Sequence, residues 1–231
     1  MLIDVVTIFP EMFAPLEISI VGKAREKGLV EIGFFNPRDY TDDPHRKVDH
    51  PQYGGSEGMV MAAPPLLGAV EDAMGSDERG ETRLLLMTPQ GKPIDQEWVK
   101  QLSQTAHVVI VCGHYKGIDD RFVELMQPEE VSIGDFVMTG GEIPAMAVVD
   151  SVVRLLPDAV GGYGSVQEDT FYEGLVDCPR YTRPRVVRGI EVPSVLLSGN
   201  HGKIAAWRHR MAAEMTRRKR PDLLEGKEST T

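Results

Sequence analysis

The chain is poor in cysteine, in aromatic residues and in long apolar runs. Its 231 residues include only two cysteines, Cys112 and Cys178, too few for a disulfide framework or a zinc site. We interpret both as reduced thiols of a cytoplasmic protein. Asp4 interrupts the first apolar stretch, and Leu2–Phe9 lacks the basic leader and cleavage pattern of a signal peptide. No segment is long and apolar enough to predict a membrane span.

An excess of positive charge is also missing, because the formal net charge is −10. That total hides an uneven distribution. Residues 1–170 hold 13 Lys and Arg against 28 Asp and Glu, whereas residues 171–231 hold 12 against 7. An acidic body is therefore followed by a basic segment, in which Arg217–Arg220 form a run. Such a segment has the electrostatic character of a nucleic-acid binder, although a solvated helix end is by itself the commoner explanation.

The apolar pattern predicts strands that alternate with helices. Strands are expected at Leu2–Ile8, Val30–Phe35, Arg83–Met87, Val108–Cys112 and Val131–Ile133, and helices at Ile18–Lys27, Pro64–Met74, Asp95–Leu102, Asp119–Met126 and Glu142–Leu156. With 42% apolar residues the chain can bury a full core. The alternation is typical of an α/β fold with a parallel sheet that is covered on both faces.

Two segments break this pattern. Residues 36–58 are irregular and rich in Asp, Pro, Gly and His, and a loop of that length is usually functional or disordered. Residues 161–170 are glycine-rich and polar, which predicts a flexible linker between a first domain at 1–160 and a second at 171–231. Helices at Pro193–Leu197 and Ile204–Arg217 make the second domain small and mainly helical.

Three glycine-rich loops follow consecutive strands in the body of the chain: Thr88–Gly91, Gly113–Gly117 and Gly134–Gly141. Open parallel sheets bind ligands beyond the carboxyl ends of their strands, and glycine lets a backbone approach a ligand closely. Any one of these loops would more often be a tight turn, but three in succession indicate a shared crevice. The P-loop pattern and the GxGxxG fingerprint are both absent, which disfavours a nucleotide-binding oxidoreductase.

The run Gly134-Asp135-Phe136-Val137-Met138-Thr139-Gly140-Gly141-Glu142 closely resembles the signature of the bacterial tRNA (guanine-N1)-methyltransferases of the SPOUT superfamily. Segments similar to other family motifs occur at Asp4–Pro10, Asn36–Tyr40, Tyr53–Gly55, Ser198–His201 and Arg220–Leu224. Each motif is weak alone. Their order and spacing, which extend over nearly the whole chain, carry the resemblance.

The resemblance implies that residues 1–160 form a SPOUT domain with a deep trefoil knot, which general folding rules would not predict. It also implies that S-adenosylmethionine binds bent in this knot, held mainly by main-chain groups. The implied cofactor-binding residues are Met87, Pro89, Gly113, Tyr115, Ile133, Gly134, Asp135, Phe136, Val137, Met138, Gly140, Gly141 and Pro144. Without the resemblance, the apolar members of this set would be assigned to ordinary core packing.

The implied reaction transfers a methyl group to N1 of the guanine at position 37, next to the anticodon of tRNA. Guanine N1 carries a proton at neutral pH, so a general base must remove it while negative charge builds on O6. The motif match assigns the base to Asp169 and the stabilisation of O6 to Arg154. Taken alone, Asp169 would be a turn residue and Arg154 would be explained by the helix dipole.

The implied partner is tRNA, and the basic C-terminal segment is expected to bind it. The candidate RNA-binding residues are Arg183, Arg185, Arg188, His201, Lys203, Arg217, Arg218, Lys219 and Arg220. The family further implies a homodimer, in which Asp169 meets the cofactor bound by the other subunit. It also implies a dependence on Mg²⁺, yet no metal-ligand cluster is legible, and Asp43, Asp49 and Glu57 are more simply solvated loop residues.

One departure from the family pattern is Lys116, which stands where many members carry Glu. Two alternatives remain beside the oxidoreductase. The first is another SPOUT methyltransferase that acts on rRNA or on a ribose hydroxyl, which would not need Asp169 in the same way. The second is a non-catalytic RNA-binding factor, against which Asp169, Arg154 and the three loops argue.

Overall fold

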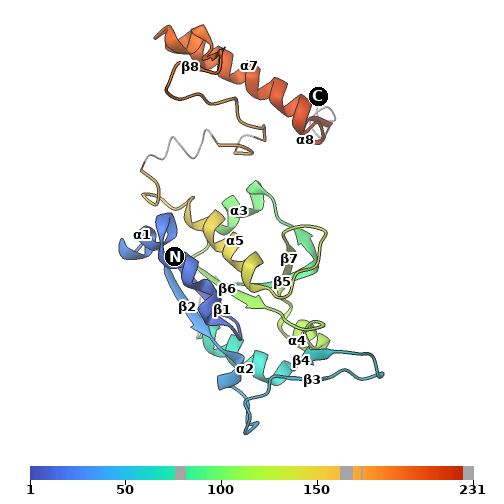
Figure 1. Cartoon of the computed structure of the whole chain (residues 1–231). Helices are drawn as coiled ribbons and strands as arrows, with labels where there is room; N and C mark the ends of the chain where they lie inside the picture. The colour runs from blue at the N-terminus through green and yellow to red at the C-terminus, as the bar shows by residue number, and fades with distance from the viewer. Residues whose placement is uncertain (76–81, 162–168, 173, 226–231) are drawn as a thin grey trace. The chain divides into compact units, whose positions relative to one another are not determined.

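The structure is a computed structural model that describes residues 1–75, 82–161, 169–172 and 174–225 (Figure 1). The chain divides into two compact units, Met1–Gly161 and Gly162–Thr231. Residues 162–168 of the predicted linker lie outside the described residues. Within the described residues, no helix combines the length and the apolar composition that a membrane span requires.

A five-stranded sheet forms the centre of the Met1–Gly161 unit (Figure 1). Its strands are β1 (Leu2–Val6), β2 (Glu31–Phe35), β5 (Thr82–Pro93), β6 (His107–Cys112) and β7 (Glu129–Ser132). They pair in the order β2-β1-β6-β5-β7, and every pair is parallel. The predicted α/β fold with a parallel sheet is therefore confirmed.

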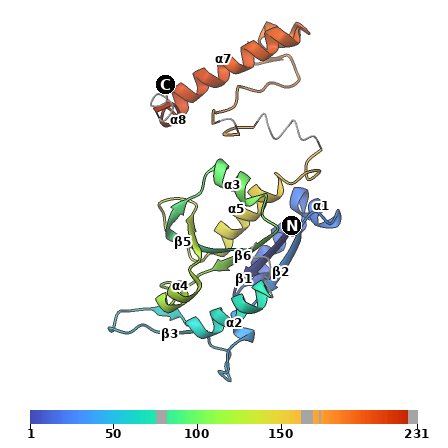
Figure 2. The same cartoon turned by 180° about the vertical axis from the view of Figure 1, so that it is seen from behind.

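Helices cover both faces of this sheet (Figures 1 and 2). One face carries α1 (Ser19–Glu26), α3 (Gln96–Leu102), α5 (Glu142–Val153) and the 3-10 helix η1 (Pro10–Glu17), and the other carries α2 (Ala63–Met74) and α4 (Asp120–Met126). Along β6, Val108 and Ile110 belong to the first core, whereas Val109 and Val111 belong to the second. Strands that are buried on both faces divide their side chains in this way, because successive residues point to opposite sides.

Side-chain caps fix where two of the helices begin. The Asp95 side chain accepts a hydrogen bond from the Trp98 N–H at 2.8 Å, so Asp95 caps α3 and the helix begins one residue later than predicted. Asp119 accepts one from the Arg121 N–H at 3.1 Å, so α4 begins one residue later than predicted. The helix α5 ends at Val153, whereas the sequence predicted that it would continue to Leu156.

The strand β5 is longer than predicted. It continues to Pro93 rather than ending at Met87, and its pairing with β7 shifts so that Met87 and Lys92 both face Val131. The residues between them bulge out of the ladder. Gly91 permits the return to the ladder, because a Cβ there would lie 2.6 Å from Val131 Cα. The predicted loop at Thr88–Gly91 is therefore an excursion within a strand.

Part of the segment 36–58 is regular, which corrects the prediction of an irregular loop. β3 (Asp49–Pro51) pairs in antiparallel fashion with β4 (Met59–Met61), and the 3-10 turn η2 covers Pro37–Asp39. Asn36 caps this turn by accepting a hydrogen bond from the Arg38 N–H at 3.0 Å. β3 is too short and polar for its sequence to show a strand pattern, so its pairing depends on the rest of the fold.

In the described part of the Gly162–Thr231 unit, the helices begin only at Ser194, and residues 169–193 contain none. The unit contains α7 (His201–Lys219), α8 (Asp222–Glu225), the 3-10 helix η3 (Ser194–Leu197) and an unpredicted hairpin of β8 (Val186–Val187) and β9 (Ile190–Glu191). α7 begins earlier than the predicted Ile204, because Asn200 caps it by accepting a hydrogen bond from the Lys203 N–H at 3.0 Å.

A buried carboxyl on β1 gives the fold a pH-dependent element. Asp4 Oδ2 lies 2.9 Å from Nε2 of His107, and Nδ1 of the same imidazole lies 3.0 Å from Thr82 Oγ1. Burial raises the pKa of Asp4 above its ordinary value, although the hydrogen bond to His107 acts against this.

We predict that Asp4→Asn changes how stability depends on pH. Because the pKa of Asp4 is higher in the folded state, its proton stabilises the fold below the unfolded pKa, and this contribution is lost as the pH rises through the folded value. The free energy of unfolding of the wild type, minus that of Asp4→Asn, should fall as the pH rises above 3.8, the ordinary pKa of an aspartate. Urea titrations at several pH values measure it, and a constant difference contradicts the prediction.

Candidate active site

A cleft of about 370 Å³ lies at the carboxyl ends of β5, β6 and β7. Its walls are the excursion at 88–90, the loop 113–118 after β6 and the segment 133–141 after β7. The three glycine-rich loops of the sequence therefore meet at one place. Open parallel sheets bind their ligands at this edge.

The structure brings most of the predicted cofactor-binding residues together in this cleft. Met87, Pro89, Gly113, Tyr115, Ile133, Gly134, Phe136, Val137, Met138, Gly140, Gly141 and Pro144 all line it. Asp135 is not among its lining residues. Sequence reasoning missed Gln90, His114, Glu130, Ser132 and Thr139, which also line it. In the sequence, only their position in or beside the three loops could have indicated that these residues line the cleft.

Two glycines let the segment after β7 lie directly against the loop after β6. The Gly141 N–H donates to the Gly113 carbonyl at 2.9 Å, and His114 and Gly140 form an antiparallel bridge. A Cβ on Gly141 would lie 2.7 Å from Cys112 Cα, and a Cβ on Gly140 would collide with the His114 ring. Gly141 must be glycine because the backbone of Cys112 and Gly113 lies so close, and Gly140 because the His114 ring and the Glu142 carboxylate occupy the space. Neither position requires glycine because of a positive φ.

The loop after β6 is also held by β4. The Lys116 N–H donates to the Met59 carbonyl at 2.9 Å, and the Met61 N–H donates to the Gly117 carbonyl at 3.0 Å. Gly58 leaves room for Lys116, whose Cγ would lie 2.6 Å from a Cβ at that position. The irregular segment of the sequence is thereby connected to a wall of the cleft.

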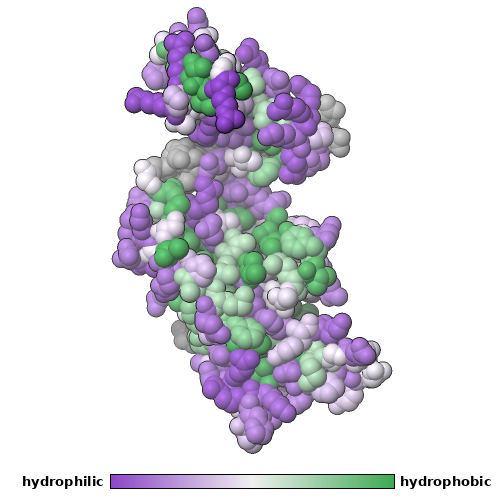
Figure 3. All heavy atoms as spheres, in the orientation of Figure 1, coloured by the Kyte–Doolittle hydropathy of each residue, from purple (hydrophilic) through white to green (hydrophobic). Residues whose placement is uncertain are grey.

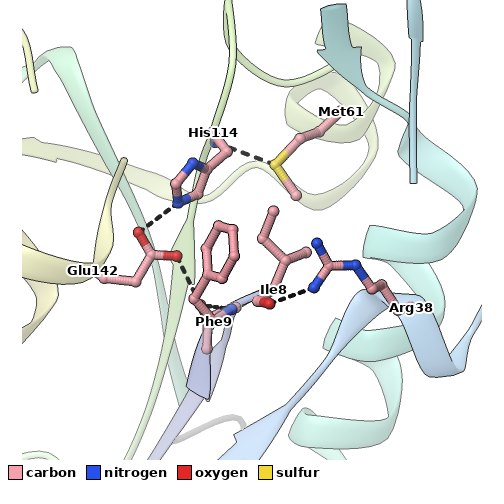
Figure 4. A network of polar contacts seen from close by, with 7 residues as sticks. Ile8, Phe9, Arg38, Met61, His114 and Glu142 are labelled. Carbon is pink, nitrogen blue, oxygen red and sulfur yellow. Dashed lines mark hydrogen bonds and ion pairs between the residues drawn. The ribbon is translucent and has the colours of Figure 1, made fainter. Parts of the chain in front are cut away.

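Glu142, the first residue of α5, places a buried carboxylate beside the cleft (Figure 4). Only 1% of the residue is exposed. Its Oε1 accepts a hydrogen bond from Thr7 Oγ1 at 2.7 Å, and its Oε2 lies 2.7 Å from His114 Nε2. Burial raises the pKa of the adjacent Cys112 thiol well above its ordinary value, and the charge of Glu142 adds to this. Cys112 is therefore a packing residue rather than a nucleophile.

The two predicted catalytic residues lie in different units. Arg154 follows the last residue of α5, and its N–H donates to the Asp150 carbonyl at 3.2 Å. A helix rises about 1.5 Å per residue, so Arg154 lies about 18 Å along the axis from Glu142. Asp169 belongs to the Gly162–Thr231 unit, where it lines a second cleft with Cys178 and Trp207.

All of the predicted RNA-binding residues are exposed. Arg183, Arg185 and Arg188 lie in and around the β8–β9 hairpin, and the others lie on α7 or at its C-terminal cap. Two of these charges have acidic neighbours, because Arg220 pairs with Asp222 at 2.6 Å and Arg185 lies 3.7 Å from Glu191. Sequence reasoning missed Arg210, which is also exposed on α7.

No group of three or more His, Cys, Asp and Glu side chains that could hold a metal ion occurs in the part of the chain that the structure describes. The loop carboxylate of Asp43 already accepts hydrogen bonds from the backbone of its own loop, at 2.7 Å from the His45 N–H. That bond is the largest cause of its lowered pKa. The local backbone thus satisfies this carboxylate.

Known proteins resemble this chain over almost its whole length. A family model described as tRNA (Guanine-1)-methyltransferase TrmD matches residues 1–226. Relatives named tRNA (guanine-N(1)-)-methyltransferase include one from Moorella thermoacetica, 48% identical over 97% of this chain and 90% of its own. One from Geobacter sulfurreducens is 48% identical over 96% of this chain and 90% of its own. One from an Exiguobacterium species is 47% identical over 100% and 95%. The chain therefore belongs to the tRNA (guanine-N1)-methyltransferase family.

Proposed function

We propose that this protein transfers a methyl group from S-adenosylmethionine to N1 of the guanine at position 37 of tRNA. The observation that carries the proposal is the glycine-lined cleft at the carboxyl edge of the sheet, in a chain that matches the methyltransferase family over residues 1–226. Methyltransferases of this kind take their methyl group from S-adenosylmethionine. We further propose that the protein acts in the cytoplasm.

The cleft suits S-adenosylmethionine because its walls combine main-chain groups with apolar side chains. Those backbone N–H and C=O groups of 113–117 and 134–141 that do not bond within the fold can bond to a polar ligand. Phe136 and Val137 are 54% and 85% exposed, so they have apolar surface left to cover an adenine ring. The implied set of cofactor-binding residues, apart from Asp135, therefore fits the cofactor.

We also propose the deep trefoil knot of the superfamily. Because β5 lies between β6 and β7, the chain that leaves β7 must cross β5 to reach its partners. It does so where Gly141 bonds to Gly113 after β6 and where Glu142 bonds to Thr7 after β1. A return path of this kind supports the threading that a knot requires.

S-adenosylmethionine supplies a methyl group on a sulfonium, which is already a good leaving group. The protein has to align guanine N1 with that methyl group and remove the N1 proton. Asp169 is the proposed base, and Arg154 is the proposed cation that stabilises the negative charge on O6. Arg154 lies about 18 Å along α5 from the cleft end of the helix. This separation supports an active site that draws on a second subunit.

Exposed apolar side chains support the proposed homodimer. Ile143 on α5 is 46% exposed, and Ile18 before α1 is 68% exposed. Figure 3 shows apolar surface across the middle of this unit, where Figure 1 draws α5. Contiguous apolar surface on a folded protein usually marks an interface. In this dimer Asp169 of one subunit would meet the S-adenosylmethionine bound by the other.

The basic surface of the Gly162–Thr231 unit is the proposed tRNA-binding surface. Its cations would neutralise backbone phosphates, and the acceptor guanine would leave its stack to reach the methyl group. We assign no residues to Mg²⁺, since no group of suitable ligands occurs among the described residues.

The proposed reaction predicts which transcript receives the label. Labelled methyl from S-adenosylmethionine should enter an unmodified tRNA transcript with two guanines on the 3′ side of the anticodon, and not one whose target guanine is adenine. Asp169→Asn should lower kcat by about 10²- to 10⁴-fold, the usual contribution of a general base. Wild-type protein that binds S-adenosylmethionine but labels neither transcript would overturn the proposal in favour of another RNA target or a binding factor.

A methyl group added at Gly141 should weaken cofactor binding. In Gly141→Ala the Cβ would lie 2.7 Å from Cys112 Cα, so the segment 139–141 must move away from the loop after β6. We expect the Kd for S-adenosylmethionine to rise about tenfold or more, because the aligned main-chain groups move with it. Gly161→Ala is the matched control, since a Cβ there meets nothing within 4 Å. Calorimetry that gives equal Kd values for both variants contradicts the proposed site.

The basic end of α7 should contribute to binding mainly through charge. Arg217→Ala together with Arg218→Ala removes two exposed cations. The slope of log K against log salt concentration for tRNA should become shallower by about 1.4 to 1.8, if each cation meets one phosphate. Fluorescence anisotropy at several salt concentrations measures this slope. Arg25→Ala, which removes a cation from the other unit, should leave the slope unchanged.

A further inference from the structure

We propose that Glu142 is a positioning residue of the cofactor cleft, whose carboxylate holds the segment 139–141 and the loop after β6 together through Thr7 and His114. The proposal rests on the assignment of this cleft to S-adenosylmethionine. Glu142 itself is not among the lining residues of the cleft, so it would act through its neighbours.

The carboxylate of Glu142 has a hydrogen-bond partner on each of its two oxygens (Figure 4). Thr7 Oγ1 donates to Oε1 at 2.7 Å and itself accepts from the Phe9 N–H at 3.0 Å. His114 Nε2 lies 2.7 Å from Oε2. A carboxylate only accepts hydrogen bonds, so Nε2 of His114 must carry the hydrogen. This bond fixes both the tautomer and the orientation of the imidazole.

The three residues belong to segments that are far apart in the sequence and adjacent at the edge of the sheet. Thr7 follows β1, His114 lies in the loop after β6, and Glu142 begins α5 directly after the segment 139–141. The neighbours of His114 and of Glu142 face the cleft: Gly113, Tyr115, Gly140 and Gly141. A shift at the carboxylate would therefore move two walls of the cleft at once.

The imidazole is held on its other sides by packing. The His114 and Phe9 rings meet edge to face with centroids 5.0 Å apart, and the Arg38 guanidinium lies 5.4 Å from the Phe9 centroid. Arg38 Nη1 also donates to the Ile8 carbonyl at 2.5 Å (Figure 4). With Glu142 and Phe9 in place, the ring has little freedom to rotate, so the backbone of residues 113–115 is fixed as well.

Stability alone does not account for a charge in this position. Burying a carboxylate costs free energy that hydrogen bonds only offset, and a well-packed apolar side chain is often as stable. The N-terminus of α5 reduces that cost, because the helix dipole favours a negative charge there. The carboxylate instead orients the three segments relative to one another, because its two short hydrogen bonds are compatible with one arrangement of them.

The chain contains a matched control for this network. Asp4 and His107 form a second carboxylate–imidazole pair, with Oδ2 and Nε2 2.9 Å apart, and Asp4 is 5% exposed. His107 begins β6, whereas the cleft lies where that strand ends, and neither residue lines the cleft. Loss of this pair perturbs the same sheet without touching the loops.

The test compares Glu142→Ala, Glu142→Gln and Asp4→Asn in binding and in turnover. We expect Glu142→Ala to raise the Kd and the KM for S-adenosylmethionine by about tenfold to a hundredfold, the range for hydrogen bonds to a charged group. The KM for tRNA and kcat at saturating cofactor should change little. Glu142→Gln should recover most of the affinity, because its amide can accept from Thr7 and donate to His114 in the other tautomer. Asp4→Asn should bind the cofactor as the wild type does.

Thr7→Val keeps the proposal testable if Glu142→Ala fails to fold. It removes the two hydrogen bonds of the Thr7 hydroxyl, to Glu142 Oε1 and from the Phe9 N–H, at nearly constant volume and leaves the carboxylate in place. It should raise the Kd for S-adenosylmethionine several-fold without affecting that for tRNA. Unchanged cofactor affinity in the folded Glu142 and Thr7 variants, or no recovery in Glu142→Gln, overturns the positioning role. A wild type that binds no S-adenosylmethionine overturns the proposed function instead. If Gly141→Ala loses cofactor binding while the Glu142 and Thr7 variants keep it, the proposed function stands and only the positioning role of Glu142 is wrong.

Discussion

The close approach of the segment 139–141 to the loop after β6 is the constraint on which the rest of the cleft depends. The Gly141 N–H reaches the Gly113 carbonyl at 2.9 Å, and neither Gly140 nor Gly141 has room for a Cβ. Because β5 separates β6 from β7, this contact also determines the path of the chain over the sheet. A loop that lies this close to its neighbour exposes main-chain groups on its other side, which is the kind of surface the cleft presents.

The structure contains two carboxylate–imidazole pairs, one at the start of β6 and one beyond its end, and they have different roles. Asp4 and His107 join β1 to the start of β6, inside the regular ladder. Glu142 and His114 join segments beyond the strand ends, where an isolated bridge and single backbone hydrogen bonds take the place of a regular ladder. Regular strands fix their own spacing through backbone hydrogen bonds, whereas loops need side chains to do so. Loss of the second pair should therefore disturb the loops of the cleft, whereas loss of the first should not.

The division of charge along the chain parallels the division into units. The acidic part of the sequence forms the Met1–Gly161 unit with its cleft, and most of the basic segment forms the exposed surface around α7. Under the proposed function, the basic surface attracts the RNA backbone through its charge, whereas the cofactor cleft belongs to the other unit. The proposed catalytic residues follow the same division, because Arg154 ends α5 and Asp169 belongs to the second unit.

The sequence by itself determined the features that depend on near neighbours. The apolar periodicity predicted the five parallel strands and their helices, the Asp95 cap needed only Trp98 three residues on, and the glycine-rich loops marked the edge that forms the cleft. Tertiary structure decided the strand order, the excursion in β5, the β3–β4 pairing and the Glu142 network. Thr7 and Glu142 are 135 residues apart, and Gly141 is glycine because of a backbone it meets only after folding. No local sequence pattern predicts such contacts, because they form only when the segment after β7 passes β5 and packs beside β6 and β1.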